Sequence, residues 1–223
     1  MDAPQPRVRP ATPADAAALA ELVNMAGEGM PLYLWTGMAG PGQDPWEVGR
    51  QRAQRESGSF SYRNATMLEV QGNVVGCLIG YKLPDVPEPV DYEQTPAIFV
   101  PVRELDSLVC GTWYVDQLAT FPRYRGQGFG TRLLEFAEEV AAAAGCHGLS
   151  IIVSDGNIGA QHFYERRGFL QIATRPMVKE GWQNSGENWG LMIKRGSALE
   201  GPHFHPGGCR PEHLAGGECL RHG

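Results

Sequence analysis

A glycine-rich turn between a predicted strand and a predicted helix is the feature that most constrains how this chain can fold. From residue 118 to 134 the sequence reads LATFPRYRGQGFGTRLL. β-branched and aromatic residues over 112–121 predict the strand, and apolar spacing over 128–144 predicts the helix. Glycines in the turn let backbone amides approach a ligand closely, at a helix start where free N–H groups favour an anion. The turn predicts a phosphate or pyrophosphate site, although glycines also serve as plain turn residues.

Two familiar phosphate-binding loops are excluded by the residues around these glycines. A Walker loop requires Gly-Lys-Ser/Thr, and here Gly130 is followed by Thr131 and Arg132. The dinucleotide fingerprint Gly-x-Gly-x-x-Gly does not match glycines at 126, 128 and 130. If the turn binds phosphate, it is therefore a loop of another kind, and a plain structural turn stays open.

Strands and helices alternate along the rest of the chain, which predicts an α/β fold with helices packed against a sheet. Thr12, Pro13 and Asp15 are typical of a helix start, and they predict that the first helix begins there. The predicted elements are, in order, a strand over 7–10, the capped helix, a loop over 27–43, a helix over 45–56, a hairpin of strands 66–70 and 74–82, an irregular insertion over 83–107, the strand and helix described above, a strand over 149–153, a helix over 158–167 that ends at Gly168, and strands over 169–178 and 189–194.

Charge and hydropathy exclude two classes of partner. The 223 residues carry a formal net charge of −6, whereas proteins that bind duplex nucleic acid usually present a basic face. The most apolar run, over 74–81, is far shorter than a membrane-spanning helix, and the N-terminus lacks the apolar core of a signal peptide. We therefore expect a cytoplasmic protein with no nucleic-acid and no membrane partner.

The cysteines and histidines give no pattern typical of a metal site or of a disulfide framework. The five cysteines are an odd number without tight spacing, and we expect free thiols. Four of the six histidines and two cysteines lie in residues 196–223, but they form no paired Cys-x-x-Cys or His-x₃-His units. We expect no metal, one domain over residues 1–195, and a disordered Gly- and His-rich tail over 196–223.

A second motif follows the glycine-rich turn, and together the two resemble a known family. The segment 157–169 reads NIGAQHFYERRGF, and the turn itself reads RGQGFG over 125–130. The pair resembles the acetyl-CoA signature and the following Asn-x-x-Ala-x-x-Phe/Leu-Tyr-Glu element of the GNAT superfamily of N-acetyltransferases. The resemblance spans most of residues 66–194. It implies a GNAT-type fold, in which a mixed, mostly antiparallel sheet is splayed at the coenzyme site and carries helices on both faces.

By this resemblance the chain would bind acetyl-CoA as a co-substrate. The strand backbone would pair with the pantetheine arm, the turn would bind the pyrophosphate, and Asn157 would contact pantetheine or cap the following helix, which is by itself a sufficient reason for an asparagine there. The implied coenzyme-binding residues are Leu118, Ala119, Thr120, Arg125, Gly126, Gln127, Gly128, Phe129, Gly130, Thr131, Asn157 and Ala160.

The resemblance also implies the catalytic groups. Tyr164 would protonate the thiolate that leaves the thioester, because a phenol can donate a proton at neutral pH. The family's usual glutamate base falls at Tyr114 in this chain. Asp116, the only carboxylate on the strand over 112–121, is expected to share a face with Tyr114 and Leu118 and to act as base instead, with Glu104 and Asp106 as alternatives.

The function implied is acetyl transfer to the amine of a small-molecule acceptor, by direct attack. The alternatives are a non-catalytic acyl-CoA-binding sensor domain and a protein or peptide N-acetyltransferase. Trp182 and Trp189 either cover the acceptor side or fill the core. The sequence leaves open the acceptor, the acyl-chain preference, and whether the protein is a monomer or a homodimer.

Overall fold

The computed structural model describes residues 6–196, and its centre is a seven-stranded sheet in the order β1-β2-β3-β4-β5-β7-β6. The only parallel neighbours are β4 and β5, and every other pair is antiparallel. This confirms the predicted mixed, mostly antiparallel sheet. The strands are β1 (Arg7–Pro10), β2 (Ala65–Val70), β3 (Asn73–Lys82), β4 (Trp113–Thr120), β5 (Gly148–Ser154), β6 (Leu170–Pro176) and β7 (Asn188–Arg195).

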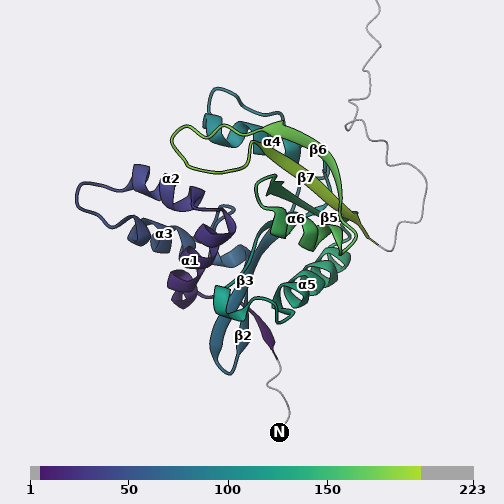
Figure 1. Cartoon of the computed structure of the whole chain (residues 1–223), viewed down its shortest axis with the longest axis horizontal. Helices are drawn as coiled ribbons and strands as arrows, with labels where there is room; N and C mark the ends of the chain where they lie inside the picture. Colours follow the sequence, from purple (N-terminus) through teal and green to yellow (C-terminus); the bar gives the residue numbers. More distant parts are fainter. Residues whose placement is uncertain (1–5, 197–223) are drawn as a thin grey trace, which may run out of the picture.

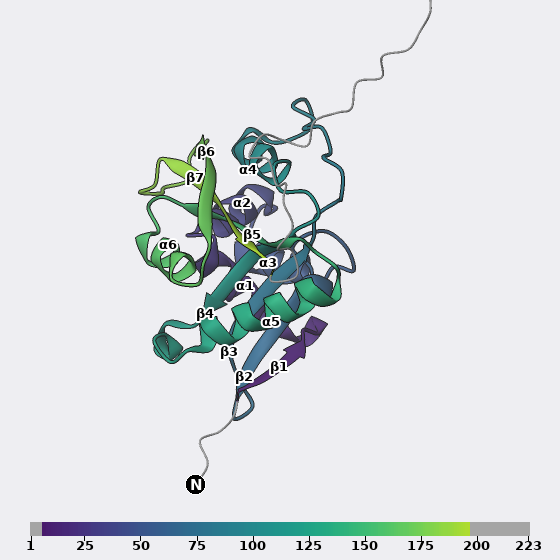
Figure 2. The same cartoon turned by 90° about the vertical axis from the view of Figure 1, so that its right-hand side faces the viewer.

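Helices cover both faces of the sheet, as Figure 2 shows for α5 on one face and α1 and α3 on the other. Buried leucines of α5 pack with β4 and β5, whereas Leu19 and Leu22 of α1 pack with β2 and β3. Each helix thus turns its apolar stripe to the sheet. The helices are α1 (Ala16–Ala26), α2 (Met30–Met38), α3 (Pro45–Ala53), α4 (Val100–Asp106), α5 (Phe129–Ala143) and α6 (Ile158–Glu165).

The sheet opens between β4 and β5, as predicted. These strands pair only at Trp113 with Leu149 and at Tyr114 with Ser150. On its other side β4 stays paired with β3 as far as Thr120. The edge of β4 that faces β5 is therefore without a strand partner beyond Tyr114. Figure 1 shows α6 beside this opening and α5 below it.

A β-bulge in β4 corrects the predicted face of Asp116. Ile79 pairs with Gln117 and the next residue, Gly80, pairs with Val115, so Asp116 is the extra residue. An extra residue shifts the alternation of side chains on the strand. As a result Tyr114 packs with Trp182 and Trp189 on one face, whereas Leu118 packs with α5 on the other. The prediction that Asp116 shares a face with both Tyr114 and Leu118 is wrong.

Two segments predicted as irregular contain helices. The loop predicted over 27–43 holds α2, and the insertion predicted over 83–107 ends in α4. In α2, Trp35 packs against α1 and α3 while Tyr33 and Leu34 pack on the aromatic cluster of Trp182 and Trp189. Because both sides of α2 are covered by apolar partners, its sequence has no polar face that would mark it as a helix.

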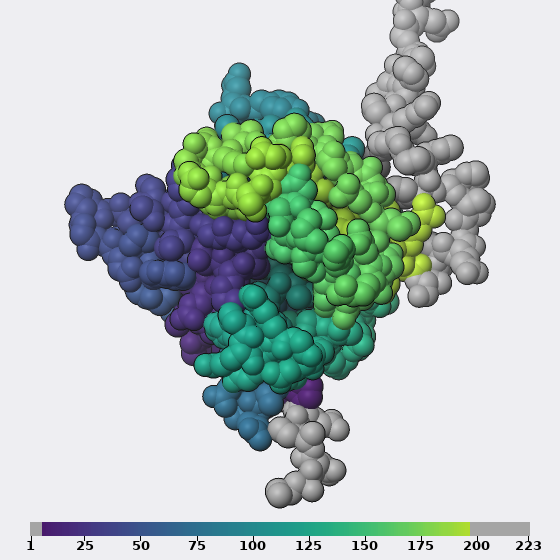
Figure 3. All heavy atoms as spheres, viewed as in Figure 1, coloured from purple at the N-terminus to yellow at the C-terminus, as the bar shows by residue number. Residues whose placement is uncertain are grey.

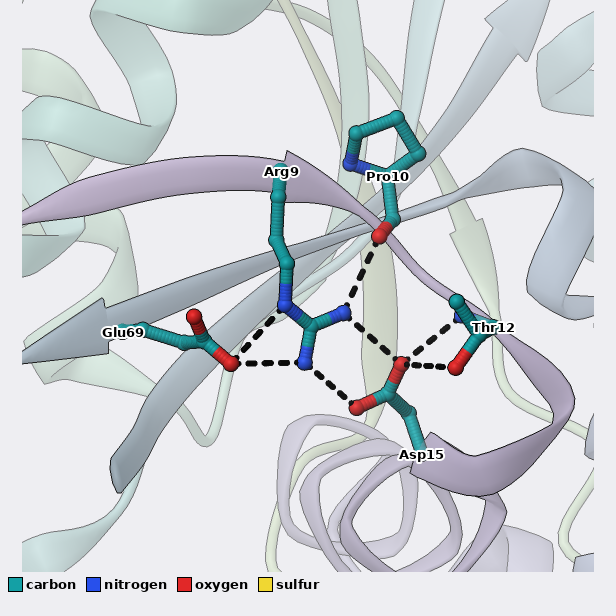
Figure 4. Close-up of polar contacts among 5 residues, drawn as sticks. All are labelled: Arg9, Pro10, Thr12, Asp15 and Glu69. Atoms are coloured by element: carbon teal, nitrogen blue, oxygen red, sulfur yellow. Dashed lines mark hydrogen bonds and ion pairs between the residues drawn. The ribbon is translucent and has the colours of Figure 1, made fainter. Parts of the chain in front are cut away.

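An ion-pair cluster anchors the N-terminal strand to the first helix (Figure 4). Arg9 donates to both carboxylate oxygens of Asp15, at 2.8 and 2.9 Å, and to Glu69 at 2.8 Å. The backbone N–H of Thr12 and its hydroxyl both donate to Asp15. One guanidinium therefore joins β1, the start of α1 and β2.

Within residues 6–196, the structure contains no helix that is long and apolar enough to cross a bilayer. Cys77 and Cys146 are free thiols, as predicted. The predicted disordered tail lies outside the described residues, apart from Gly196.

Candidate functional site

The turn before α5 presents consecutive backbone amides that have no acceptor in the described part of the chain. The Arg125 N–H donates to Pro122 and the Arg132 N–H donates to Gly128, but the amides of 126–131 donate to neither backbone nor side chain. These amides stand at the N-terminus of a helix of 15 residues, where the helix dipole adds a partial positive charge. The arrangement suits an anion with several oxygens, such as a pyrophosphate.

The glycines give the turn its shape. Gly126 and Gly128 adopt φ of 74° and 84°, in the left-handed region that favours glycine, and Gly128 is the N-cap of α5. The side chain of Gln127 donates to the Arg123 carbonyl at 3.2 Å and braces the turn from within. The Arg125 side chain is exposed and is engaged by no described residue, so it is free to meet a phosphate.

The three segments predicted to form the coenzyme site meet at Gly130. A Cβ built on Gly130 would lie 3.4 Å from the Phe163 ring and 3.8 Å from Leu118. The start of α5, the end of β4 and α6 are therefore in close contact. The ring of Phe129 packs edge-on to Tyr124, which leaves only its amide to face a ligand.

Arg167 belongs to this junction, although the sequence analysis did not single it out. Its guanidinium lies over the Phe163 ring, 3.8 Å from the centroid, and donates to the Phe163 carbonyl at 3.0 Å. It also donates to the Thr131 hydroxyl. Thr131 is thus held by Arg167, and its side chain is not free in this structure. An arginine after a helix carries no local signal for such a contact.

Tyr164 lies on α6 with its ring 4% exposed, between Phe163 and Phe169. Burial raises the pKa of its phenol, and the nearby Arg167 opposes that shift. The phenol consequently stays protonated at neutral pH. The Tyr164 hydroxyl has no hydrogen-bond partner among the described residues. It is not fully buried, so part of the oxygen is accessible.

Asn157 caps α6, which confirms one of its two predicted roles. Its Oδ1 accepts from the Ala160 N–H at 3.1 Å, and its Nδ2 donates to Glu28 at 3.0 Å. Both ends of the side chain and the Ala160 amide are therefore engaged within the protein. A pantetheine contact by Asn157 or Ala160 remains a prediction.

Two carboxylates, Asp106 and Asp116, are electrostatically coupled to Tyr81 and Tyr114. Asp116 is half-buried in the bulge, and burial raises its pKa to about 6. Burial likewise raises the pKa of Asp106 to about 7, helped by the charge of Asp116 and opposed by Arg103. Both acids raise the pKa of Tyr114 in addition to the effect of its burial. The Asp106 Oδ1 is buried without a partner, and its Oδ2 lies 3.8 Å from Arg103.

The remaining alternative base, Glu104, is engaged elsewhere. Its carboxylate accepts from Arg175 at 2.7 Å and from the Tyr92 hydroxyl at 3.3 Å. A cavity of about 230 Å³ lies between the 83–91 segment and α4, and Arg103 and Asp106 contribute to its wall. Of the three acids, Asp106 therefore has both an unpartnered oxygen and an adjoining space.

Figure 3 shows a hollow between the purple N-terminal helices, the green surface that contains α6 and the teal surface of the turn before α5. We call it the central hollow. Trp182 and Trp189 stack with ring centroids 5.9 Å apart, inside the core cluster that contains Tyr114. Within residues 6–196, no group of three or more His, Cys, Asp or Glu side chains is arranged to hold a metal ion.

Comparison with known proteins places these features in one family. Residues 32–169 match the model of the acetyltransferase (GNAT) family. The chain is 32% identical over 79 residues to a thialysine N-epsilon-acetyltransferase of Mus musculus, which is 33% of this chain and 44% of that protein. It is 33% identical over 69 residues to the enzyme of the same name from Bos taurus, which is 31% of this chain and 38% of that protein. The matches thus span less than half the length of these relatives.

Solved structures agree with the fold. An N-acetyltransferase from Staphylococcus aureus Mu50 superposes with a TM-score of 0.62 and 24% identity, covering 84% of this chain and 100% of that chain. Another structure described as an acetyltransferase gives a TM-score of 0.58 at 24% identity, covering 85% of this chain and 99% of that one.

Proposed function

This chain belongs to the acetyltransferase (GNAT) family, and we propose that it transfers the acetyl group of acetyl-CoA directly to an amine of a small-molecule acceptor. The observation that carries the proposal is the run of unpartnered amides over 126–131, next to the open edge of β4. The pyrophosphate of acetyl-CoA would accept from the amides over 126–131, and the peptide-like amides of its pantetheine arm would pair with the open edge of β4. Its acetyl thioester supplies the activated carbonyl.

The residues of the turn and the strand fit this co-substrate. The amides over 126–131 and the Arg125 side chain would hold the pyrophosphate. The free backbone groups over 118–120 would pair with the pantetheine arm and orient the acetyl carbonyl. Holding donor and acceptor side by side makes the attack effectively intramolecular, which supplies much of the acceleration.

Two side chains would move the protons. Asp116 would accept a proton from the acceptor ammonium, and its pKa of about 6 leaves it unprotonated and available above that pH. The amine nitrogen then bonds to the acetyl carbon as the carbon–sulfur bond breaks. Tyr164, kept protonated by burial, would give its proton to the departing thiolate, and the second proton that the acylated nitrogen loses as the amide forms would restore the phenol.

The acceptor is best described as a cationic amine. The charge of Asp116 raises the pKa of Asp106, so the two acids are electrostatically coupled. Arg103 stands 3.8 Å from Asp106 and is 60% exposed. An ammonium group would neutralise these acids better than Arg103 does. The name of the relatives, thialysine N-epsilon-acetyltransferase, points to a side-chain amine of this kind.

Thiol release from acetyl-CoA, measured against a panel of diamines, lysine analogues, aminoglycosides and basic peptides, tests the proposal. We expect release that depends on a small cationic amine, together with thermal stabilisation by acetyl-CoA. Release with peptides alone would favour a protein N-acetyltransferase. Stabilisation without release from any acceptor would favour a sensor domain, and no stabilisation would contradict the coenzyme site.

The Tyr164→Phe variant tests the proton donor. We expect kcat to fall about 100-fold, the usual scale for loss of a general acid, because the thiolate then leaves unprotonated. The dissociation constant of acetyl-CoA, measured by titration calorimetry, should change less than about twofold, since the buried ring is kept. Phe163→Leu, next to it on α6, is the control for packing. An unchanged kcat in Tyr164→Phe would remove the assignment.

A further inference from the structure

Glu28 occupies a strained backbone position between α1 and α2. Its φ is 53°, in the left-handed region that a non-glycine residue adopts at a cost of about 1 kcal/mol. Glycine stands on both sides of it, at 27 and 29, so the chain has residues suited to such a turn. A glutamate that persists in this conformation indicates that its side chain makes contacts that hold it there.

Three hydrogen bonds join Glu28 to segments far away in the sequence. Its Oε1 accepts from Asn157 Nδ2 at 3.0 Å and its Oε2 accepts from Asn184 Nδ2 at 2.8 Å. Its backbone carbonyl accepts from Trp182 Nε1 at 3.1 Å. Hydrogen bonds to a carboxylate are about twice as strong as those between neutral groups. Each carboxylate oxygen therefore accepts one hydrogen bond from a distant asparagine.

The partners of Glu28 belong to the start of α6 and to the loop before β7, and the green surface that contains α6 borders the central hollow (Figure 3). Asn157 caps α6, the helix that carries Tyr164. Asn184 accepts from the Gly186 N–H at 2.6 Å and lies 3.3 Å from the Ser154 hydroxyl, so it holds the loop before β7 against the end of β5. Trp182 stacks on Trp189. Glu28 therefore links the N-terminal helices to the β5–α6 turn and to the 182–186 loop.

We propose that Glu28 is a positioning residue that fixes the distance between the wall bearing α6 and the wall bearing α2, and so sets how an acceptor lies against the acetyl donor. The kinetic part of this inference rests on the proposed function, whereas the link itself does not. The turn bearing Glu28 reaches Asn157 across 129 positions of the sequence, so no local structure fixes that distance in its absence. Loss of the carboxylate would leave two amides without their acceptor and the two walls without this tie.

Three substitutions at Glu28 separate the effect of losing the carboxylate from the effect of relieving the backbone strain. Glu28→Ala removes the carboxylate and keeps the strain, whereas Glu28→Gly removes both, because glycine accepts φ of 53°. Glu28→Gln keeps one oxygen, so it can satisfy only one of the two asparagine amides. Glu21→Ala, an exposed acid on α1, is the matched control.

We expect Glu28→Ala and Glu28→Gly, which lose both hydrogen bonds to the carboxylate, to raise the acceptor KM about tenfold, which corresponds to about 1.4 kcal/mol. Glu28→Gln should lie between them and the parent, and Asn184→Ala should show part of the effect. The acetyl-CoA dissociation constant should stay within about twofold, because the 126–131 turn is untouched. A uniform structural loss would instead change all of these constants, and rescue by glutamine would be absent.

Hydrogen–deuterium exchange tests the link without any activity. We expect faster amide exchange over 154–160 and 181–187 in Glu28→Ala and Glu28→Gly, with exchange over 65–82 unchanged. Unchanged exchange in the first two segments would overturn the proposal. If the parent shows no turnover while exchange rises as expected, the proposed function fails and the link stands.

Discussion

Asp15 and Asp106 are two carboxylates of nearly equal burial whose pKa values shift in opposite directions. The side chain of Asp15 is 8% exposed and that of Asp106 is 11% exposed. Asp15 receives hydrogen bonds from Arg9 and Thr12, which hold its pKa below the ordinary value despite its burial. Asp106 has only Arg103 at 3.8 Å and one oxygen without a partner, and burial raises its pKa to about 7.

The difference lies in how each buried charge is compensated. Burial of a charge is costly unless hydrogen bonds and a counter-charge replace the lost water. The network around Asp15 meets that requirement inside the protein (Figure 4). Asp106 does not meet it, because one of its oxygens has no partner among the described residues, and under the proposed function a cationic acceptor would supply the missing charge.

The largest expected effect is loss of turnover in Asp116→Asn. We expect kcat to fall at least about 100-fold, because an amide cannot accept the proton of the ammonium. In the parent, kcat/KM should rise as the pH rises through about 6, where Asp116 loses its proton, and this acidic limb should vanish in the variant. The measurement is a pH–rate profile of both proteins. A limb that survives in Asp116→Asn would assign the base to Asp106, which Asp106→Asn then tests.

Asp15→Asn should affect stability instead of turnover. We expect the free energy of unfolding at pH 7 to fall by about 2–3 kcal/mol, since Arg9 loses one of its two charged partners in a largely buried site and keeps only Glu69. The folded pKa of Asp15 is lowered, so its contribution is fully present above the ordinary value of 3.8 and is lost as the pH falls through the folded pKa. Urea unfolding at pH 7 and at pH 3 measures this. If Asp15→Asn lowered kcat as strongly as Asp116→Asn does, Asp15 would not be a purely structural acid.

Asp106→Asn should do the reverse and stabilise the protein at pH 8. Its folded pKa of about 7 exceeds the ordinary 3.8, so the unfolded chain releases this proton first and stability is lost as the pH rises toward 7. A neutral side chain removes that loss, which is at most about 4 kcal/mol at pH 8, from about 1.4 kcal/mol per pH unit between 3.8 and 7, and which vanishes below pH 4. Thermal unfolding at both pH values measures it. Equal stability of parent and variant at pH 8 would show that Asp106 already has a counter-charge.

Most of the second half of the fold could be predicted from the sequence, because its elements carry local signals. The strand–turn–helix around Gly126 and Gly128, the cap at Asn157 and the helix end at Gly168 each depend on residues a few positions apart. The two motifs therefore fixed the order of β4, α5, β5 and α6. The roles of Tyr164 and Asp116 remain predictions that the experiments above test.

Features that depend on distant partners could not be predicted. The bulge at Asp116 arises where β4 passes Gly80, whose missing side chain makes room for Trp113: a Cβ there would lie 2.0 Å from its ring. A glycine inside a strand can signal a bulge, but it does not say in which strand the extra residue lies. The contacts of Glu28 and Arg167 span 129 and 36 positions and have no local pattern at all.

Arg103→Gln should give the smallest effect. It tests how strongly the charge of Arg103 lowers the pKa values of Asp106 and Asp116. Arg103 lowers the pKa of both Asp106 and Asp116, so its loss should move the acidic limb of kcat/KM upward. Because it is 60% exposed and 3.8 Å from Asp106, water and salt screen it, and we expect a shift of only a few tenths of a pH unit and a stability change below about 0.5 kcal/mol.

Arg63→Gln is the matched control, since Arg63 is also 60% exposed but pairs with Glu56 far from the site. It should leave the limb in place. Raising the salt concentration should move the limb of the parent toward that of Arg103→Gln, because salt weakens the same attraction. A shift of more than about one unit, which corresponds to 1.4 kcal/mol, would mean that Arg103 is a true partner of these acids, and Asp106 would then resemble Asp15 more than the geometry indicates.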